Sequence, residues 1–474
     1  MPEKTIYDIC VIGAGSGGLS VAAAAASFGE KVVLIEKHKM GGDCLNTGCV
    51  PSKALLAAAK QAHAFSSGEA FGVKSQVAKV DFAKVNDHVK DVIAGIAPHD
   101  SVERFESLGV NVIQAAGKFV DGQTVEAGGE TIKARRFVVA TGSSAAAPPV
   151  PGLDEVDFLT NETVFELRQR PERLVIIGGG PIGMEMAQAH SRLGSQVTVL
   201  EAFDPLGKDD PEHTSIVLEK LAAEGIEILS RIKITKIAKS KDGITIDLED
   251  NGAQRRINGS HLLVAAGRSA NVEGLDLEAA GIKYSRRGIE VDEGLRTSNR
   301  NVYAIGDVAG GLQFTHVAGY HAGLVVKNIL FRLPIKNKTA HVPWVTYTDP
   351  ELAHVGMTAA MAKESNTPHK VLKWSFAEND RARAERATYG LVTVVIAKNT
   401  KILGATITAP NAGELIQPWA LAISSGLKIK AMIDQIVAYP TWGEVNRRVA
   451  ITHYADFPAS PAVRRVISWL KIFG

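Results

Sequence analysis

The chain contains few cysteines and few aromatic residues. Three cysteines in 474 residues exclude a scaffold held together by disulfides, which would need many more. Aromatic residues make up only 6%, and no uninterrupted apolar run reaches the roughly 20 residues that span a membrane. Neither sign of charge dominates, because 53 Lys and Arg face 51 Asp and Glu, and the net charge of +2 gives no electrostatic basis for binding nucleic acid.

The length of the chain exceeds what a single hydrophobic core supports. A chain of 474 residues predicts about three domains. The first strand-like run begins near Tyr7, which leaves no room for a secretory leader, so we expect a cytoplasmic protein. In that reducing compartment, a pair of nearby cysteines is more often catalytic than structural.

Two of the cysteines lie in the segment GGDCLNTGCVPSKALL, residues 41–56. Residues 46–48 can form a turn that brings Cys44 and Cys49 together, and an Ala/Leu-rich helical stretch follows. A thiol at a helix N-terminus has a lowered pKa, because the partial positive charge there favours the thiolate. The pattern therefore predicts a dithiol/disulfide site. A zinc site needs about four ligands, and Cys10 lies in an apolar run with no His near it, so we expect no metal site.

Two segments, residues 6–37 and 174–201, share one plan of strand, glycine turn, helix and strand. The expected helices begin at Leu19 and Met184. In both, an acid lies 23 residues after the first glycine, from 13 to 36 and from 178 to 201. Such glycines let a backbone approach a pyrophosphate, the helix N-terminus balances its charge, and the acid accepts hydrogen bonds from ribose hydroxyls. The glycines are Gly13, Gly15 and Gly18 in the first segment and Gly178, Gly180 and Gly183 in the second. The chain is therefore predicted to bind two dinucleotides.

The pattern GGxCxNxGCxPSK in residues 41–53 resembles the redox-active segment of the flavoprotein disulfide reductases, the family of dihydrolipoamide dehydrogenase, glutathione reductase and mercuric reductase. The resemblance spans nearly the whole chain, through VVATGSS, LLVAAGRS, VYAIGDVAG and FTHVA. FTHVA, residues 314–318, resembles a loop beside the flavin. The resemblance implies an α/β fold with two Rossmann-like dinucleotide-binding domains and a C-terminal α+β dimerisation domain. The sequence from about Pro343 suits such an α+β domain, with a strand-rich stretch near 388–409 and a helix near 412–426. The expected division is 1–150 for the first part of the FAD domain, 151–270 for the NAD domain, 271–342 for the central part of the FAD domain and 343–474 for the interface domain.

The resemblance also assigns residues. It implies that FAD binds the first dinucleotide unit and the nicotinamide binds the second. Cys49 is implied to be the charge-transfer thiolate that faces the flavin, and Cys44 the interchange thiol. Lys53 and Glu185 are implied to lie beside the flavin ring. The implied catalytic residues are Cys44, Cys49, Lys53, Glu185, Tyr439 and Glu444. The implied cofactor-binding residues are Gly13, Gly15, Gly18, Glu36, Lys37, Gly42, Lys53, Gly117, Thr141, Gly142, Ser143, Gly178, Gly180, Gly183, Glu201, Gly267, Asp307 and Ala318.

The end of the second dinucleotide segment predicts which nicotinamide is used. Glu201 pairs well with a free ribose 2′-hydroxyl and repels a 2′-phosphate. No Arg follows it closely in the sequence, where Lys208 is the nearest cation. The sequence therefore favours NADH over NADPH.

One position departs from the family pattern. The family's acid/base is a His followed by Pro-Thr and, five residues on, a Glu; here the segment reads AYPTWGE, with Tyr439 in place of the His and Glu444 in register. A phenol with a pKa of about 10 is a poor base at neutral pH. His316, His321 and His453 are not obvious substitutes, and we expect His453 on the helix that follows Glu444.

The C-terminal segment SPAVRRVISWLKIFG has an amphipathic pattern. Helical periodicity places Val463, Val466, Ile467, Leu470 and Phe473 on one face, with Arg464, Arg465 and Lys471 among the rest. Packing against the protein's own dimer is the favoured interpretation. Weak contact with a membrane surface is the alternative.

The predicted function is an FAD-dependent, NADH-linked disulfide/dithiol oxidoreductase, homodimeric and similar to dihydrolipoamide dehydrogenase, acting on a small disulfide, a dithiol or a lipoyl protein. Mercury and glutathione are not favoured as substrates, because WLKIFG lacks the terminal Cys pair of mercuric reductase and glutathione reductases use NADPH and the His. The alternatives are a reductase of metal ions or quinones, whose acceptor needs no protonated thiol leaving group, and a flavin-bearing redox sensor or assembly subunit. The sequence does not name the acceptor or the direction of the reaction.

Overall fold

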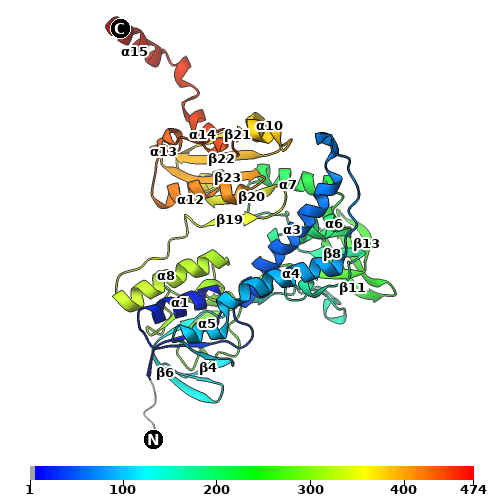
Figure 1. Ribbon diagram of the computed structural model, residues 1–474, viewed down its shortest axis with the longest axis vertical. Coiled ribbons are helices and arrows are strands. Elements are labelled where there is room, and N and C mark those ends of the chain that lie inside the picture. The colour runs from blue at the N-terminus through cyan, green and yellow to red at the C-terminus, as the bar shows by residue number, and fades with distance from the viewer. Residues whose placement is uncertain (1–5) are drawn as a thin grey trace. The chain divides into compact units, whose positions relative to one another are not determined.

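The computed structural model describes residues 6–474, and the chain forms two compact units (Figure 1). Unit 1 comprises the described residues up to Phe203 together with Ile226–Lys338. Unit 2 comprises Asp204–Gly225 and Thr339–Gly474. Within residues 6–474, no helix is both long enough and apolar enough to cross a membrane.

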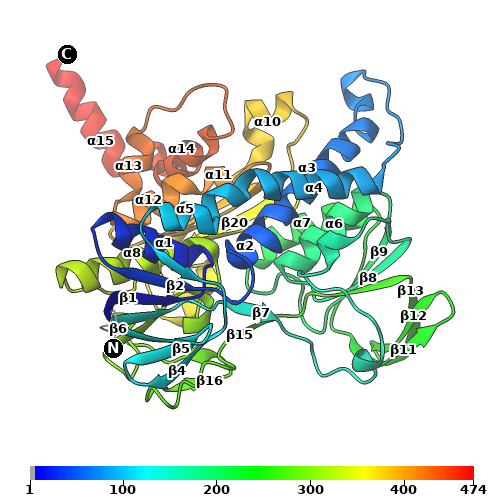
Figure 2. The ribbon, with the colours of Figure 1, turned by 60° about the horizontal axis from the view of Figure 1, so that its bottom comes forward.

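A large sheet in unit 1 has the strand order β3-β2-β1-β6-β5-β4, with β18 beside β6 (Figure 2). Its strands are β1 (Ile6–Ile12), β2 (Val32–Ile35), β3 (Asn111–Ile113), β4 (Gly117–Asp121), β5 (Thr124–Ala127), β6 (Glu130–Val139) and β18 (Val302–Ala304). The strands β3, β2, β1, β6 and β18 pair in parallel, and β2 is buried along its whole length, as expected where helices cover both faces of a parallel sheet. Because β18 returns to this sheet late in the chain, residues 302–304 lie beside residues 137–139 of β6.

A second parallel sheet in unit 1 has the order β10-β9-β8-β14, and the antiparallel ribbon β11-β12-β13 accompanies it. These strands are β8 (Arg173–Ile177), β9 (Gln196–Leu200), β10 (Glu227–Leu229), β11 (Lys233–Ser240), β12 (Gly243–Asp250), β13 (Ala253–Gly259) and β14 (His261–Val264). Short strands β7 (Ser143–Ala145) and β15 (Arg268–Ala270) pair with each other, as do β16 (Tyr284–Ser285) and β17 (Gly288–Ile289).

The helices of unit 1 are α1 (Ser16–Ser27), α2 (Gly42–Asn46), α3 (Cys49–Ser66), α4 (Phe82–Ile96), α5 (Val102–Ser107), α6 (Pro181–Arg192) and α8 (Thr315–Phe331). Both glycine segments form the predicted strand, turn, helix and strand, but α1 and α6 begin three residues before the predicted starts at Leu19 and Met184. The reason is that the last glycine of each motif lies inside the first helical turn. The segment 314–318, which we expected to be a loop, instead begins α8.

Unit 2 contains an antiparallel sheet with the order β19-β20-β23-β22-β21. Its strands are β19 (Pro343–Thr346), β20 (Glu351–Gly356), β21 (His369–Ser375), β22 (Leu391–Ala397) and β23 (Ile402–Ala409). Its helices are α7 (Pro211–Ala223), α9 (Ala359–Glu364), α10 (Asp380–Ala384), α11 (Ala412–Leu415), α12 (Gln417–Ser424), α13 (Ile429–Asp434), α14 (Glu444–Ile451) and α15 (Pro461–Leu470). Together with the sheets of unit 1, these elements confirm the predicted α/β class.

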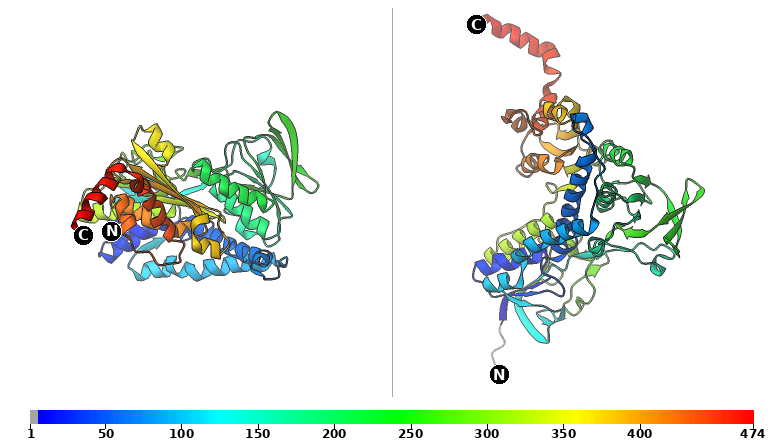
Figure 3. Two further views of the ribbon diagram at one scale, coloured as in Figure 1. Left: turned by 90° about the horizontal axis from the view of Figure 1, so that it is seen from above. Right: turned by 45° about the vertical axis from the view of Figure 1, so that its right-hand side comes forward.

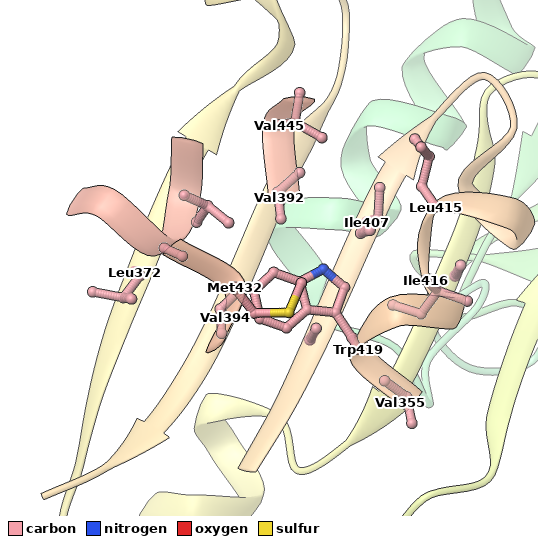
Figure 4. Packing of buried hydrophobic residues seen from close by; sticks show 14 of the residues in the cluster. Val355, Leu372, Val392, Val394, Ile407, Leu415, Ile416, Trp419, Met432 and Val445 are labelled. Carbon is pink, nitrogen blue, oxygen red and sulfur yellow. The ribbon is translucent and has the colours of Figure 1, made fainter. Parts of the chain in front are cut away.

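Trp419 lies at the centre of the core of unit 2, with Met432 beside it (Figure 4). Its indole N–H donates to Oδ1 of Asn446 at 2.8 Å, which satisfies the buried nitrogen. The single helix predicted near 412–426 is wrong, because α11 and α12 are separate helices that meet at Ile416. Pro418 lies in the first turn of α12, where its missing N–H interrupts the continuous helical hydrogen bonding.

The C-terminal part of unit 2 runs from α14 through short helical turns to α15. His453 lies in a 3-10 turn (Thr452–Tyr454) directly after α14, and not in the helix where we expected it. Figure 3 shows α15 extending away from the sheet of unit 2. The predicted amphipathic tail is therefore helical over Pro461–Leu470, and a 3-10 turn (Lys471–Phe473) ends it.

Candidate active site

The first glycine turn links β1 to α1 and is shaped by backbone contacts. Gly13 has φ +106°, and a Cβ there would lie 2.4 Å from the carbonyl oxygen of Ala140. A Cβ on Gly18 would lie 1.8 Å from the carbonyl oxygen of Gly13. No side chain caps the start of α1, and its first turn carries no acid, so the amides there remain available to an anion. Glu36 accepts a hydrogen bond from the Ala14 amide at 2.7 Å.

The second glycine turn links β8 to α6 and repeats these features. Gly178 has φ +114°, and a Cβ on Gly183 would lie 1.9 Å from the carbonyl oxygen of Gly178. Glu201 accepts from the amides of Gly179 at 2.6 Å and Phe203 at 2.8 Å. The start of α6 also has no side-chain cap and no acid in its first turn. The two turns therefore fit the pyrophosphate groups of two dinucleotides.

The cysteine segment is held directly against the first glycine turn. The Gly41 amide donates to the Ala14 carbonyl at 2.9 Å. Gly42 has φ +58°, and a Cβ there would lie 2.7 Å from the Cα of Gly15. This close approach requires glycine at position 42, and it places α2 and the cysteines beside the first dinucleotide turn.

The two cysteines lie on successive helices, Cys44 in α2 and Cys49 at the first position of α3. Both are free thiols in the structure. The Sγ of Cys49 lies 3.3 Å from Oγ1 of Thr315, the first residue of α8. The pKa of Cys49 is lowered to about 6, chiefly by the hydrogen bond from Cys44 and further by Thr315 and the charge of Lys53. Desolvation of the thiolate opposes this effect. The same hydrogen bond and burial raise the pKa of Cys44. The pair thus holds one thiolate and one thiol near neutral pH.

Lys53 and Glu185 are brought together from α3 and α6, 132 positions apart in the chain. The Nζ of Lys53 donates to Oε2 of Glu185 at 2.8 Å. The carboxylate is nearly buried, with 6% of its side chain exposed, while the Lys53 side chain is 39% exposed. The ion pair holds the ammonium one helical turn from Cys49, on the same helix.

Asp43 is fixed by partners from distant segments, which the sequence analysis did not single out. Its Oδ1 accepts from Asn161 at 2.8 Å, and its Oδ2 lies 3.2 Å from Arg268. Arg268 also donates to the hydroxyl and the carbonyl of Ser143, each at 2.7 Å. Arg268 lies in the motif LLVAAGRS, and Thr315 lies in FTHVA. Neither motif indicates that Arg268 contacts Asp43 or that Thr315 contacts Cys49.

The Ser143 hydroxyl donates to Oδ2 of Asp307 at 2.5 Å, which joins the start of β7 to the turn after β18. Burial raises the pKa of Asp307. Thr141 donates to the Asn271 carbonyl at 2.8 Å. The remaining predicted positions lie as follows: Gly142 and Gly267 with positive φ in loops, Gly117 at the start of β4, Ala318 in the first turns of α8 and Lys37 directly after Glu36.

Tyr439 belongs to unit 2, and it does not pair with Glu444. Its hydroxyl donates to Oδ2 of Asp380 at 2.9 Å, and its side chain is 67% exposed. The hydrogen bond and the charge of Asp380 raise the pKa of Tyr439. Glu444 instead accepts from Nε of Arg448 at 2.8 Å. Among the other histidines, His321 accepts from the buried Gly306 amide at 3.2 Å, which gives it a structural role.

Comparisons with known proteins identify the family of the chain. The family described as pyridine nucleotide-disulphide oxidoreductase matches residues 7–322, and its dimerisation domain matches residues 342–450. A mercuric reductase of Bacillus cereus is 36% identical over 453 residues, covering 95% of this chain and 72% of that protein. A dihydrolipoyl dehydrogenase of Geobacillus stearothermophilus is 34% identical over 449 residues, covering 93% of this chain and 94% of that protein.

Among solved structures, the Cu(II) complex of the HOCl-induced flavoprotein disulfide reductase RclA from Escherichia coli has a TM-score of 0.83 and 27% identity, covering 93% of this chain and 99% of that one. The predicted fold, enzyme class and homodimer are therefore confirmed at the level of the family, as are FAD and a pyridine nucleotide as its cofactors. The chain belongs to the pyridine nucleotide-disulphide oxidoreductase family and is an FAD-dependent disulfide oxidoreductase.

Proposed function

We propose that Cys44 and Cys49 form the redox-active disulfide of this oxidoreductase. The observation that carries the proposal is the environment of Cys49, which lies at the first position of α3, 3.3 Å from the Thr315 hydroxyl and with a pKa lowered to about 6. A thiolate attacks disulfides and soft metal ions, whereas a thiol does not. Two electrons and one proton convert the disulfide to a Cys49 thiolate and a Cys44 thiol. Cys49 is the proposed flavin-side sulfur, and Cys44, which must lose its proton before it attacks, is the sulfur that exchanges with substrate.

The first glycine turn, Glu36 and the Ser143–Asp307 pair are proposed to hold FAD, and the second glycine turn to hold the nicotinamide. When bound, the flavin carries two electrons between the nicotinamide and the dithiol. The ammonium of Lys53, fixed by Glu185, supplies positive charge beside Cys49. The proposed domain division is unchanged: 1–150 and 271–342 for FAD, 151–270 for the nicotinamide and 343–474 for the interface.

NADH is the proposed nicotinamide. Glu201 is fixed at the end of β9 by the Gly179 and Phe203 amides, so its carboxylate stays where a 2′-phosphate would be repelled. The backbone amide of Arg231 donates to the Phe203 carbonyl at 3.2 Å, so Arg231 adjoins the segment that follows Glu201. A cation there would favour a 2′-phosphate, and we propose that the carboxylate of Glu201 dominates the preference.

A small disulfide, a dithiol or a lipoyl group is the first proposed substrate class, and the reducing cytoplasm is the proposed compartment. Dithiol exchange needs a proton acceptor for the incoming thiol, which typically contributes about 10² to 10⁴ in rate. Tyr439 is poorly suited to this, because Asp380 raises its pKa. The exchange step is therefore expected to be slow.

A thiophilic metal ion is the second candidate acceptor, and the Tyr439–Asp380 hydrogen bond is the observation that favours it. A metal ion accepts electrons from a dithiol without a leaving thiolate to protonate, so a missing acid/base has no cost. Relatives with 34–36% identity are mercuric reductases, and the Escherichia coli reductase RclA was solved as a Cu(II) complex.

The test is a steady-state screen of the purified holoprotein with NADH, comparing lipoamide, glutathione disulfide, Cu(II), Hg(II), a soluble quinone and oxygen. Turnover that requires both cysteines with one of these acceptors supports the proposal and assigns the class. The Cys44→Ser and Cys49→Ser variants each serve as the matched control. If no acceptor is reduced, or if the serine variants retain full turnover, the proposed enzymatic role of the pair is wrong and a sensor role replaces it.

Tyr439→His separates the two candidates. Beside the retained Pro440 and Glu444, an imidazole should raise lipoamide turnover by about tenfold or more. Tyr439→Phe is the control, because it removes the Asp380 hydrogen bond without adding a base. If the histidine brings no gain in dithiol exchange while metal reduction stays fast, the disulfide acceptor is excluded in favour of the metal ion.

A further inference from the structure

The C-terminal helix α15 exposes an apolar face. Val466, Ile467, Trp469 and Leu470 are 55%, 49%, 58% and 52% exposed, and no residue of α15 is buried. At about 100° per residue, Val463, Val466, Ile467 and Leu470 share one side of the helix, with Trp469 at its border. Apolar side chains exposed together on one helix face indicate a surface that something covers.

The opposite side of the helix is basic. Arg464, Arg465 and Ser468 lie there, and Lys471 follows in the terminal turn. The sequence from Phe457 to Gly474 contains no Asp or Glu, so its side chains carry a net charge of +3 from two Arg and one Lys. An apolar stripe beside an uncompensated basic one is the arrangement of helices that lie in the headgroup region of an anionic bilayer.

Aromatic residues at the end of the helix fit the same surface. The rings of Trp469 and Phe473 contact edge to face, with centroids 5.0 Å apart, and Phe473 is 72% exposed. Tryptophan is enriched at membrane–water interfaces, because its ring is apolar and its N–H is polar.

A second copy of the chain is the competing occupant, and the family comparison weighs against it. The dimerisation domain of the family matches residues 342–450 and ends before α15, so the tail lies outside the matched domain. Pairing of α15 with its copy in a second chain would bring like charges together, because every charged side chain in the tail has the same sign.

We propose that α15 binds the surface of an anionic lipid bilayer, with its apolar face in the acyl boundary and its cations against the lipid phosphates. The contact is interfacial, because the helix Pro461–Leu470 is far too short to span the hydrocarbon core. Each cation near an anionic surface contributes about a fivefold change in affinity, so three cations give on the order of a 100-fold preference for anionic over neutral vesicles. Salt weakens this preference by screening.

The experiment is flotation of the full-length holoprotein with vesicles of phosphatidylglycerol and phosphatidylcholine in equal parts, and with vesicles of phosphatidylcholine alone. We expect binding to the mixed vesicles that exceeds binding to the neutral ones by about 100-fold and falls at high salt. Ile467→Ser with Leu470→Ser should reduce binding at least tenfold. Arg464→Gln with Arg465→Gln should reduce the preference for anionic vesicles by about 25-fold.

Val77→Ser is the matched control, because Val77 is 90% exposed in unit 1 and undergoes a comparable change from an apolar side chain to serine. It should bind vesicles as the wild type does. Flavin content and the rate of NADH oxidation should be the same in all variants, which shows that they fold. Equal binding to both vesicle types, or full binding by the Ile467/Leu470 variant, would overturn the proposal. A change of oligomeric state in that variant by light scattering, without vesicle binding by the wild type, would assign the tail to a second copy instead.

Discussion

The acidity of the Cys49 thiol depends on Thr315 as well as on Cys44. In the reduced protein, alkylation by iodoacetamide should follow a pKa of about 6, because only the thiolate reacts, and the rate should fall as pH drops below that value. Thr315→Val removes the hydroxyl at 3.3 Å and should raise the pKa of Cys49 by about one unit. Ser52→Ala is the control, because its hydroxyl bonds the Cys49 carbonyl and not the sulfur. If the pH dependence of alkylation is unchanged in Thr315→Val, Thr315 does not lower the pKa of Cys49.

The choice of nicotinamide is also decided at single residues. Glu201→Gln removes the negative charge and should reduce the NADH-to-NADPH ratio of kcat/KM by about five- to tenfold, in line with roughly 1 kcal/mol for the lost contact. Glu36→Gln is matched to it, since Glu36 makes an equivalent backbone contact in the first glycine turn, and it should leave the ratio unchanged. If the wild type prefers NADPH and Arg231→Ala abolishes that preference, Arg231 recognises the 2′-phosphate and the NADH proposal is wrong.

At the scale of elements, the approach of α2 to the first glycine turn connects the thiols to the dinucleotide. Gly42→Ala would place a Cβ 2.7 Å from the Cα of Gly15, so one backbone must move. We expect a loss of flavin and a loss of stability about 1–3 kcal/mol larger than that of a matched variant. Gly29→Ala is that variant, because Gly29 also has positive φ, +83°, but nothing lies within 4 Å of its Cβ position. Thermal unfolding and flavin absorbance measure both effects. Equal effects of the two changes would show that the contact is unimportant.

The whole molecule should lose stability in mild acid, because each unit buries a neutral histidine. His190 in unit 1 is fully buried, and His213 in unit 2 bonds Thr393 and Thr408 at 2.8 and 2.9 Å. Burial lowers the pKa of each to about 4. The unfolded chain, with a His pKa of about 6.5, therefore binds more protons between pH 6.5 and 4, and stability falls as pH decreases through that window.

The size of this effect is up to about 3 kcal/mol for each histidine. His213→Gln should lower the unfolding temperature at pH 8 but make its decline between pH 6.5 and 4 shallower. His88→Gln, at an exposed position, should change neither. A wild-type unfolding temperature that stays constant across the window would contradict the prediction.

The sequence by itself determined the local structure and the chemistry of the short motifs. Both glycine turns, their flanking strands and the helix that begins at Cys49 follow from neighbouring residues, because turns, helix starts and apolar periodicity are set within a few positions of the chain. The same patterns carried the family resemblance. The prediction for residues 412–426 was wrong because two local rules compete there. The apolar pattern favours one helix, whereas Pro418 divides the stretch into two.

Only the tertiary structure decided which residues meet. Thr315 lies 266 positions from Cys49 and contacts its sulfur, and Arg268 at the start of β15 reaches Asp43. Tyr439 occupies the position of the family's histidine but is paired with Asp380 rather than Glu444. Such contacts depend on how helices and sheets pack, so no spacing in the sequence encodes them. The acidity of Cys49 and the weak basicity of Tyr439 therefore came from packing, although the residues themselves were visible in the sequence.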